Sequence, residues 1–440
     1  MRVGDRVELR IENVTPEGEG VGPVDGREVR VPGVFPGETA LVRIEAVSRH
    51  HPRAHARLLE LRSSAPGRRE PPCPQDIAAG GRCGGCALSA LAPEAQREAK
   101  RAMLASRFGL EVGALVHGEA LGYRFSSKRV VATQRGRLVL GSYIRGTHRV
   151  ADMEGCLVDH PRIREAADEL ARVATDARVI PYDEGTGQGD LRYVWLKTDG
   201  ERVLVTLVTS AAESPAAKVL PELLSRADGV AHAVQSGRGN AVRGEDVRML
   251  RGIEHLELLL GGVEAHVGPL GFLQPNPSVA ARAYEDLVRG PDGATLTGGL
   301  ALDLYAGAGV TTALLRRSFA RVAPAESYPE SARTLGVPAV STERFLEERL
   351  AAPEHPDRHP DLVVANPPRG GLGPDAAASL VRLGAPRVHV MSCHPEALVR
   401  DLAILLAPTG PYRLVRIAAY DTLPETPHVE LVAWLEKVPG

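Results

Sequence analysis

The sequence predicts a multidomain protein with a small β-barrel, an α+β region and an α/β domain, in that order along 440 residues. Three observations support this fold class. Short alternating strands with glycine-rich turns fill the first segment, and β patterns with interspersed helices fill the second. Strands that alternate with helices fill the third. We therefore expect domains at residues 1–62, 63–265 and 266–440.

Bulk composition excludes several classes of protein. No apolar run approaches the ~20 residues that span a membrane, so we expect no membrane partner. The start, "MRVGDRVELR", has no apolar signal core, which predicts a cytoplasmic protein. The 53 Lys and Arg residues nearly balance the 55 Asp and Glu residues, so bulk charge does not indicate a nucleic-acid binder. The window 121–150, however, carries seven Arg or Lys and no acid, a pattern equally typical of phosphate contact and of a solvated loop.

Residues 1–62 predict a barrel of the OB type. Apolar and polar residues alternate in "DRVELRIENV", "EVRVPGV" and "ALVRIEAV", and "TPEGEGVGPVDG" and "FPGE" supply the turns. Small barrels of this kind often bind nucleic acid. A purely structural barrel without a ligand remains the alternative on pattern alone.

Four of the five cysteines lie in the first part of the chain, and an odd total does not suit a disulfide framework. Cys73, Cys83 and Cys86 stand as C-x9-C-x2-C around "GGRCGGC", and Cys156 follows much later in the chain. Four thiolates form a complete shell for zinc or for an iron–sulfur cluster. Spacing alone favours zinc, because structural zinc is commoner, and it assigns Cys156 less firmly than the other three.

The third segment carries a nucleotide-type ligand pattern. "LALDLYAGAGVTT" is an apolar strand that ends in a glycine-rich turn before a helix, where the backbone can approach a ligand or simply pack tightly. Glu326 in "PAESYPESA" follows where an acid could bond a ribose hydroxyl. "ANPPRGGL" at 365–372 adds a polar residue before a rigid Pro-Pro turn. This ordered set is more specific than any of its members.

Cys393 is the only cysteine after Cys156. It follows the apolar run "RVHVM" and precedes Pro395 and a helix-like stretch, so it falls at the carboxyl end of a strand, where open α/β sheets bind ligands. Taken alone, a buried and inert thiol is the commoner interpretation.

Taken together, these motifs resemble the S-adenosylmethionine-dependent RNA 5-methyluridine methyltransferases over essentially all 440 residues. The resemblance rests on the order of "CGGC", "GFLQPNP", "DLYAGAG", "NPPRGGL", "SCHPEALVRDL" and "DTLPETPHVELV". It implies an RNA-binding barrel of the TRAM type at the start and a Rossmann-like class I methyltransferase domain at the end. It also implies that the four cysteines hold a [4Fe–4S] cluster rather than zinc.

The resemblance also implies a role for each site residue. Uracil C5 is a poor nucleophile, and a thiolate of Cys393 that attacks C6 would make C5 enolate-like, so that it can take the methyl group. Glu430 in "TPHVELV" then matches the acceptor of the C5 proton. The positions that match cofactor contacts are Gln274, Tyr305, Glu326 and Asn366. We expect a monomer that acts on a single-stranded or flipped uridine, in ribosomal RNA rather than transfer RNA.

Several positions depart from the family pattern. Asn366 replaces an Asp, His394 replaces an Asn, and Pro324 lies in what should be an apolar central strand, where proline removes a ladder donor. A rival hypothesis is a non-catalytic RNA-binding protein of the same fold with a decayed methyl-donor pocket. The presence of both Cys393 and Glu430 favours the enzyme. A radical enzyme that shares the barrel is disfavoured because the chain has no C-x3-C-x2-C triplet.

Overall fold

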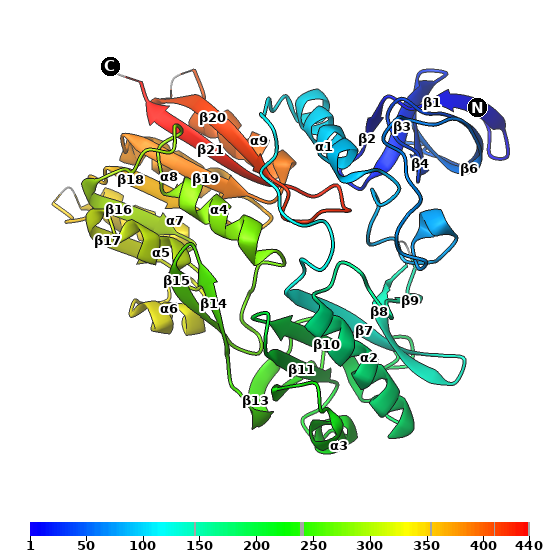
Figure 1. The fold of residues 1–440 in the computed structure, drawn as a ribbon. Helices are drawn as coiled ribbons and strands as arrows, with labels where there is room; N and C mark the ends of the chain where they lie inside the picture. The colour runs from blue at the N-terminus through cyan, green and yellow to red at the C-terminus, as the bar shows by residue number, and fades with distance from the viewer. Residues whose placement is uncertain (145–146, 238–241, 353, 409, 439–440) are drawn as a thin grey trace.

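The computed structural model describes residues 1–144, 147–237, 242–352, 354–408 and 410–438 (Figure 1). In the described part, two six-stranded sheets, one seven-stranded sheet and one two-stranded sheet account for the strands. The N-terminal sheet, the central sheet and the C-terminal sheet occupy separate regions of the molecule (Figure 1). Among these residues, no helix has both the length and the apolar character needed to cross a membrane.

The N-terminal sheet curls around one apolar core. Its strand order is β1-β5-β6-β4-β3-β2, and its strands are β1 (Arg6–Arg10), β2 (Asn13–Val14), β3 (Glu19–Val24), β4 (Arg27–Pro32), β5 (Thr39–Val47) and β6 (Arg53–Ser63). Alternate residues along the first part of β5 point inward, which buries Val42 and Ile44. The sheet is crowded at Gly22, where a Cβ atom would lie 2.0 Å from the carbonyl oxygen of Arg10, so only glycine fits there.

The connection to the central region contains the short helix η1 (Ile77–Ala79) and the helix α1 (Pro93–Phe108). Pro93 is the first residue of α1, where its missing N–H costs no hydrogen bond. Gly109 ends the helix with a φ of +65°. Helix α1 lies between the N-terminal sheet and the C-terminal domain (Figure 1), in contact with β2 and α9.

The central sheet has the order β13-β12-β11-β10-β7-β8-β9. Its strands are β7 (Ser126–Gln134), β8 (Arg137–Tyr143), β9 (Val150–Asp152), β10 (Leu191–Thr198), β11 (Val203–Thr209), β12 (Gly229–Val234) and β13 (Glu245–Gly252). Helices α2 (Pro161–Asp176) and α3 (Pro215–Leu223) pack on it. The buried residues of α2 recur at three- and four-residue spacing, from Ile163 through Leu170, so one stripe of the helix faces the sheet.

The C-terminal domain is an α/β sheet with the order β17-β16-β18-β19-β21-β20. Its strands are β16 (Gly298–Leu304), β17 (Phe319–Ala325), β18 (Leu362–Ala365), β19 (Arg387–Ser392), β20 (Tyr412–Tyr420) and β21 (Glu430–Lys437). Its helices are α4 (Pro277–Leu287), α5 (Val310–Leu315), α6 (Pro329–Leu335), α7 (Thr342–Ala351), α8 (Gly373–Leu383) and α9 (Pro395–Leu405). The first four strands in this order run parallel, and β21 is antiparallel to both of its neighbours.

Two apolar clusters line this sheet. Helices α7, α8 and α9 contribute to one cluster, and α4, α5 and the hairpin of β14 (Leu256–Leu260) and β15 (Val263–Val267) contribute to the other. Pro324 lies in β17, which is the edge strand of the sheet and not a central one. The expectation that Pro324 lies in a central strand is therefore wrong, and an edge strand tolerates proline.

Candidate active site and cysteine pocket

Cys393 and Glu430 lie at the ends of two neighbouring strands, on the same side of the C-terminal sheet. Strand β19 ends at Ser392, which pairs with Leu431 of β21. Continuing this antiparallel register by one residue brings Cys393 opposite Glu430. The thiol is half-buried, and the Glu430 side chain is buried with 4% of the residue exposed. The two residues that the resemblance assigns to catalysis are therefore neighbours, although they come from different strands and are distant in sequence.

Burial raises the pKa of Glu430 from 4.5 to about 8. Burial also raises the pKa of the Tyr284 hydroxyl, a side-chain hydrogen bond with Gln274 lowers it, and the charge of Glu430 raises it. Tyr284 thus connects Gln274, on the segment that precedes α4, with the buried carboxyl of Glu430. A carboxyl with a pKa close to neutral pH can both accept and release a proton during turnover.

Two charged groups act on the Cys393 thiol in opposite directions. Burial raises the pKa of Cys393, and the charge of Glu430 raises it further, whereas Arg369 lowers it by its charge and by a hydrogen bond. Arg369 belongs to the "NPPRGGL" motif after β18. The sequence pattern did not predict which group lowers the pKa of the Cys393 thiol. The arginine in the motif was the one feature that could have indicated such a group.

The remaining positions that the resemblance assigns to cofactor contacts follow the ends of neighbouring parallel strands. Tyr305 follows β16 with a φ of +61°, in the left-handed region, and opens the glycine turn before α5. Glu326 follows β17, and its carboxylate accepts hydrogen bonds from the backbone N–H of Gly307 at 2.8 Å and of Tyr328 at 2.6 Å. Asn366 follows β18, and its N–H donates to the Leu304 carbonyl. Because these strands are parallel, their carboxyl ends bring these positions to the same side of the sheet as Cys393.

A buried acid braces the same turn. Asp303, near the end of β16, accepts hydrogen bonds from the hydroxyls of Thr311 at 2.7 Å and Thr312 at 2.5 Å. Burial raises the pKa of Asp303 to about 6. These contacts hold the start of α5 against the strand end. His394 has a comparable role at α9, because its Nδ1 accepts from the N–H of Ala397 and caps the helix, as an Asn side chain also does.

The four cysteines that the sequence grouped together line one cavity. Cys73, Cys83 and Cys86 come from the loop around η1, and Cys156 comes from the turn after β9. All four thiols are free. Burial raises the pKa of Cys73, Cys86 and Cys156, and the charge of Arg124 opposes this rise at Cys86 and Cys156. Thiolates are the ligands of both structural zinc sites and iron–sulfur clusters, so four cysteines that line one cavity are a candidate metal site.

The loop that precedes Glu430 is anchored to the cysteine pocket. Glu425 lines this pocket, and its backbone carbonyl accepts from the N–H of Leu88 at 2.9 Å. Both carboxylate oxygens of Glu425 accept from Arg69 at 2.7 Å. The buried Lys100 of α1 donates to Asp421 at 2.6 Å, to the Leu423 carbonyl at 3.1 Å and to the His428 carbonyl at 3.0 Å. Segments from the first quarter of the chain thus fix a loop near its end.

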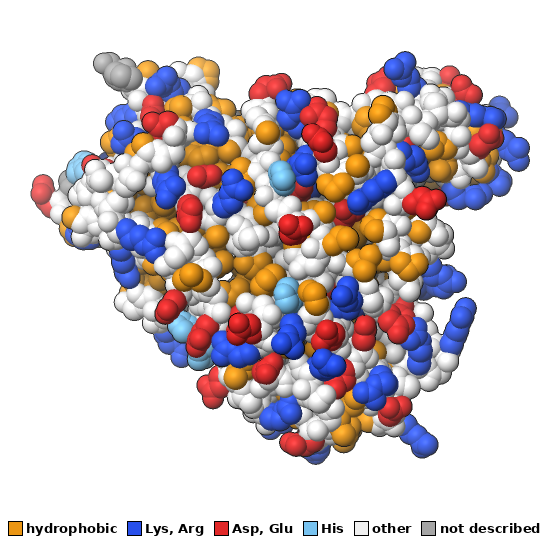
Figure 2. Space-filling model, viewed as in Figure 1, with side chains coloured by type: hydrophobic (Ala, Val, Ile, Leu, Met, Phe, Trp, Pro, Cys, Tyr) orange, Lys and Arg blue, Asp and Glu red, His pale blue; other side chains and the backbone are white. Residues whose placement is uncertain are grey.

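Part of the charge in the basic window 121–150 is paired within the protein. Arg129 is buried, forms an ion pair with Asp159 and donates to the Met153 carbonyl at 2.8 Å. Arg137 pairs with the mostly buried Asp152 and with the exposed Glu154, whereas Arg135 is exposed on the turn between β7 and β8. Arg145 lies outside the described residues. Figure 2 shows basic and acidic side chains interspersed over the face of the molecule that it views. Basic side chains also lie along the outer side of the N-terminal sheet at the upper right.

Comparison with known proteins identifies relatives of the whole chain. Residues 339–438 match the family described as tRNA (Uracil-5-)-methyltransferase, and residues 1–56 match the TRAM domain. An uncharacterized RNA methyltransferase of Gloeobacter violaceus is 30% identical over 459 residues, which cover 99% of this chain and 97% of that protein. One of Halalkalibacterium halodurans is 28% identical over 456 residues, covering 98% and 97%.

A solved structure shares the whole fold. The crystal structure of Pyrococcus abyssi tRNA (uracil-54, C5)-methyltransferase in complex with S-adenosyl-L-homocysteine has a TM-score of 0.74 and 25% identity, and covers 98% of this chain and 100% of that chain. The fold and the relatives define an S-adenosylmethionine-dependent RNA methyltransferase with an N-terminal TRAM domain. The chain belongs to the RNA methyltransferase family of the uracil-5 type. The prediction of an enzyme of this class is confirmed.

Proposed function

We propose that this enzyme transfers a methyl group from S-adenosylmethionine to C5 of a uridine in RNA through a covalent bond between the Cys393 sulfur and C6 of the base. The observation that carries the proposal is the placement of Cys393 and Glu430 at the ends of adjacent strands, with Arg369 acting on the thiol. This arrangement offers a nucleophile, a cation that favours its thiolate form and a proton acceptor within one edge of the sheet.

Each residue then has a defined step. The Cys393 thiolate attacks C6, and the electrons of the 5,6 double bond move toward the O4 carbonyl. C5 attacks the methyl group, and S-adenosylhomocysteine leaves. Glu430, as its carboxylate, removes the proton from C5, and the restored 5,6 double bond expels the thiolate. A pKa of about 8 makes Glu430 a stronger base than an ordinary carboxylate once it has ionised.

We expect the methyl donor to bind next to this site, where the parallel strands of the C-terminal sheet end. We propose that Tyr305, Glu326, Asn366 and Gln274 contact it. Glu326 suits ribose hydroxyls because a carboxylate offers about four acceptor positions, and the two backbone N–H donors use only two of them. Asn366 offers an amide where the family pattern has a carboxylate, which changes its charge but not its ability to accept a hydrogen bond.

We propose that Cys73, Cys83, Cys86 and Cys156 hold a [4Fe–4S] cluster and not zinc. The convergence of four free thiols on one cavity supports a metal, and the resemblance to the family favours iron. Anaerobically purified protein should be brown and contain about four irons per chain, as the cluster formula requires. Colourless protein with one equivalent of zinc would contradict the assignment.

The decisive experiment for the reaction uses RNA that carries 5-fluorouridine, whose C5 fluorine cannot be removed as a proton is. Wild-type enzyme should form a protein–RNA species that survives denaturing electrophoresis, and Cys393→Ala should not. Glu430→Gln should form such a species with ordinary RNA, with turnover reduced ~10²- to 10⁴-fold. Methylation of C5 by Cys393→Ala would overturn the covalent mechanism.

The target RNA is a separate part of the proposal. We propose a uridine in ribosomal RNA, held single-stranded or flipped, with transfer RNA as the second candidate because the solved relative is named for transfer RNA. Mapping 5-methyluridine in both RNA pools from a deletion strain distinguishes them. We also propose a cytoplasmic monomer, and light scattering of the purified protein would test its oligomeric state.

A further inference from the structure

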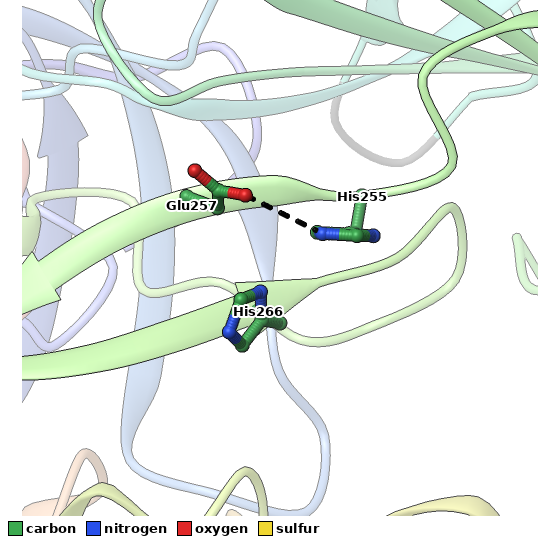
Figure 3. A group of neighbouring side chains, drawn as sticks. All are labelled: His255, Glu257 and His266. Carbon is green, nitrogen blue, oxygen red and sulfur yellow. Dashed lines mark ion pairs between the residues drawn. The ribbon is translucent and has the colours of Figure 1, made fainter.

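Three side chains that commonly bind metals meet on the hairpin of β14 and β15, outside the active site (Figure 3). His255 lies just before β14, Glu257 lies in β14 and His266 lies in β15. One potential ligand atom from each residue lies within 4.8 Å of those from the other two. All three residues are exposed.

The strand pattern explains why they meet. Leu256 and Leu258 of β14 are buried, so Glu257 between them points outward. His266 points outward in the same way from β15 and is the direct cross-strand partner of Glu257. His255 completes the group, with its Nε2 3.6 Å from the Glu257 carboxylate and its ring 5.0 Å from the His266 ring, at 75°.

The donor set selects a class of ion. Two imidazoles and one carboxylate suit Zn²⁺ and its first-row neighbours, whereas Mg²⁺ and Ca²⁺ prefer oxygen ligands alone. Zinc–nitrogen bonds of ~2.0–2.1 Å place tetrahedral ligand atoms about 3.4 Å apart, so the three side chains must close slightly. Exposed side chains can make this adjustment by rotation without losing packing.

One neighbour competes for the carboxylate. Arg202, on the turn between β10 and β11, lies 3.5 Å from Glu257 and 2.8 Å from Asp199. The shorter pair with Asp199 can persist when Glu257 turns to a metal. Exposed ion pairs contribute little stability, so this competition is weak.

We propose that His255, Glu257 and His266 form a binding site for a divalent transition metal of the zinc type, with solvent in the remaining coordination positions. The ion would link the two strands at the open end of the hairpin. Residues 268–271 follow directly, and their carbonyls at Gly268, Pro269 and Gly271 accept from Lys197 at 2.8, 2.9 and 2.6 Å. The metal would therefore stabilise the segment that leads to Gln274, and it takes no part in methyl transfer.

Copper(II) provides a spectroscopic test in tag-free, full-length protein with its cysteine pocket loaded as purified. One equivalent of Cu²⁺ should give an electron paramagnetic resonance spectrum with coupling to two imidazole nitrogens. Zn²⁺ should compete with it, as followed by titration calorimetry. His255→Ala and His266→Ala should weaken Zn²⁺ binding by at least ~10- to 100-fold, since loss of an outer-shell partner alone costs that much.

Glu264→Gln is the matched control, because Glu264 is an exposed acid on the same face of β15 but not in the group. It should leave affinity and spectrum unchanged. Full retention of Zn²⁺ binding in His255→Ala and His266→Ala would overturn the proposal. So would thiolate-to-metal charge transfer on adding Co²⁺, which would place the binding in the cysteine pocket, or the absence of binding at submillimolar Zn²⁺.

Discussion

Replacing Glu430 by Gln should change the pH dependence of stability as well as activity. The carboxyl has a pKa of about 8 in the folded enzyme and 4.5 as its ordinary value. The folded chain therefore binds this proton more tightly than the unfolded chain does. Below pH 4.5 both states hold the proton, so the stabilisation that the bound proton provides is fully present. As the pH rises from 4.5 to about 8, only the unfolded chain releases the proton, and stability falls until it levels off above 8.

The magnitude follows from the two pKa values. A difference of this size corresponds to ~5 kcal/mol between the two plateaus, and to about 3 kcal/mol between pH 5.5 and 8.5. The glutamine side chain of the variant stays neutral, so the variant lacks this loss. Its stability relative to the wild type should rise by that amount between the two pH values. For a domain of this size, 1 kcal/mol shifts the unfolding temperature by ~2–4 °C, so the difference in unfolding temperature should change by ~6–12 °C.

Scanning calorimetry of both proteins at several pH values measures this difference. Titrating groups that the Glu430 charge does not reach are common to the two proteins and cancel in the comparison. The charge does act on Cys393 and Tyr284, but the first-listed cause of the raised pKa of each of these two groups is burial, which both proteins share. Glu436→Gln is the control, because Glu436 lies near the other end of β21 with its side chain 30% exposed. Its effect on unfolding temperature should not change with pH across this window. A constant difference between wild type and Glu430→Gln would refute the raised pKa and the argument for a strong base.

Three further predictions concern the surroundings of the site. Lys100→Met leaves the buried Asp421 carboxylate unpaired and should destabilise the loop by ~3–5 kcal/mol, measured as faster hydrogen exchange across residues 421–430. Arg369→Gln removes a cation that lowers the pKa of Cys393, so alkylation of this thiol by iodoacetamide should need a higher pH. Cys86→Ser should lower bound iron and unfolding temperature together, and unchanged iron content would exclude Cys86 as a ligand.

The elements of the fold were predictable because they depend on local patterns. Alternation indicated the N-terminal strands, and the glycine turn after "LALDL" indicated the end of β16. The order of strands within a sheet has no such local signature. Pro324 was assigned to a central strand, whereas β17 lies at the edge, and only the three-dimensional pairing shows this.

The site divides in the same way. Motif order singled out Cys393 and Glu430, and the strand register explains why they meet. The role of Arg369 was not predicted, since a motif letter does not show which neighbour a side chain reaches. Arg129 illustrates the reverse case: it counted toward a basic window, but Asp159 neutralises it in the interior. Composition cannot separate charges that face a ligand from charges paired within the fold.

The loop 421–429 makes the position of Glu430 depend on segments from the N-terminal part of the chain. It lies directly before Glu430, so any displacement of the loop moves the proposed base. Its anchors come from Arg69 beside the cysteine segment and from Lys100 on α1, and not from the C-terminal sheet alone. A methyltransferase domain cut away from residues 1–110 would leave the acceptors of both cations unpaired, at a cost of several kcal/mol for each buried charge. We therefore infer that the cysteine pocket and α1 position the proposed base through this loop.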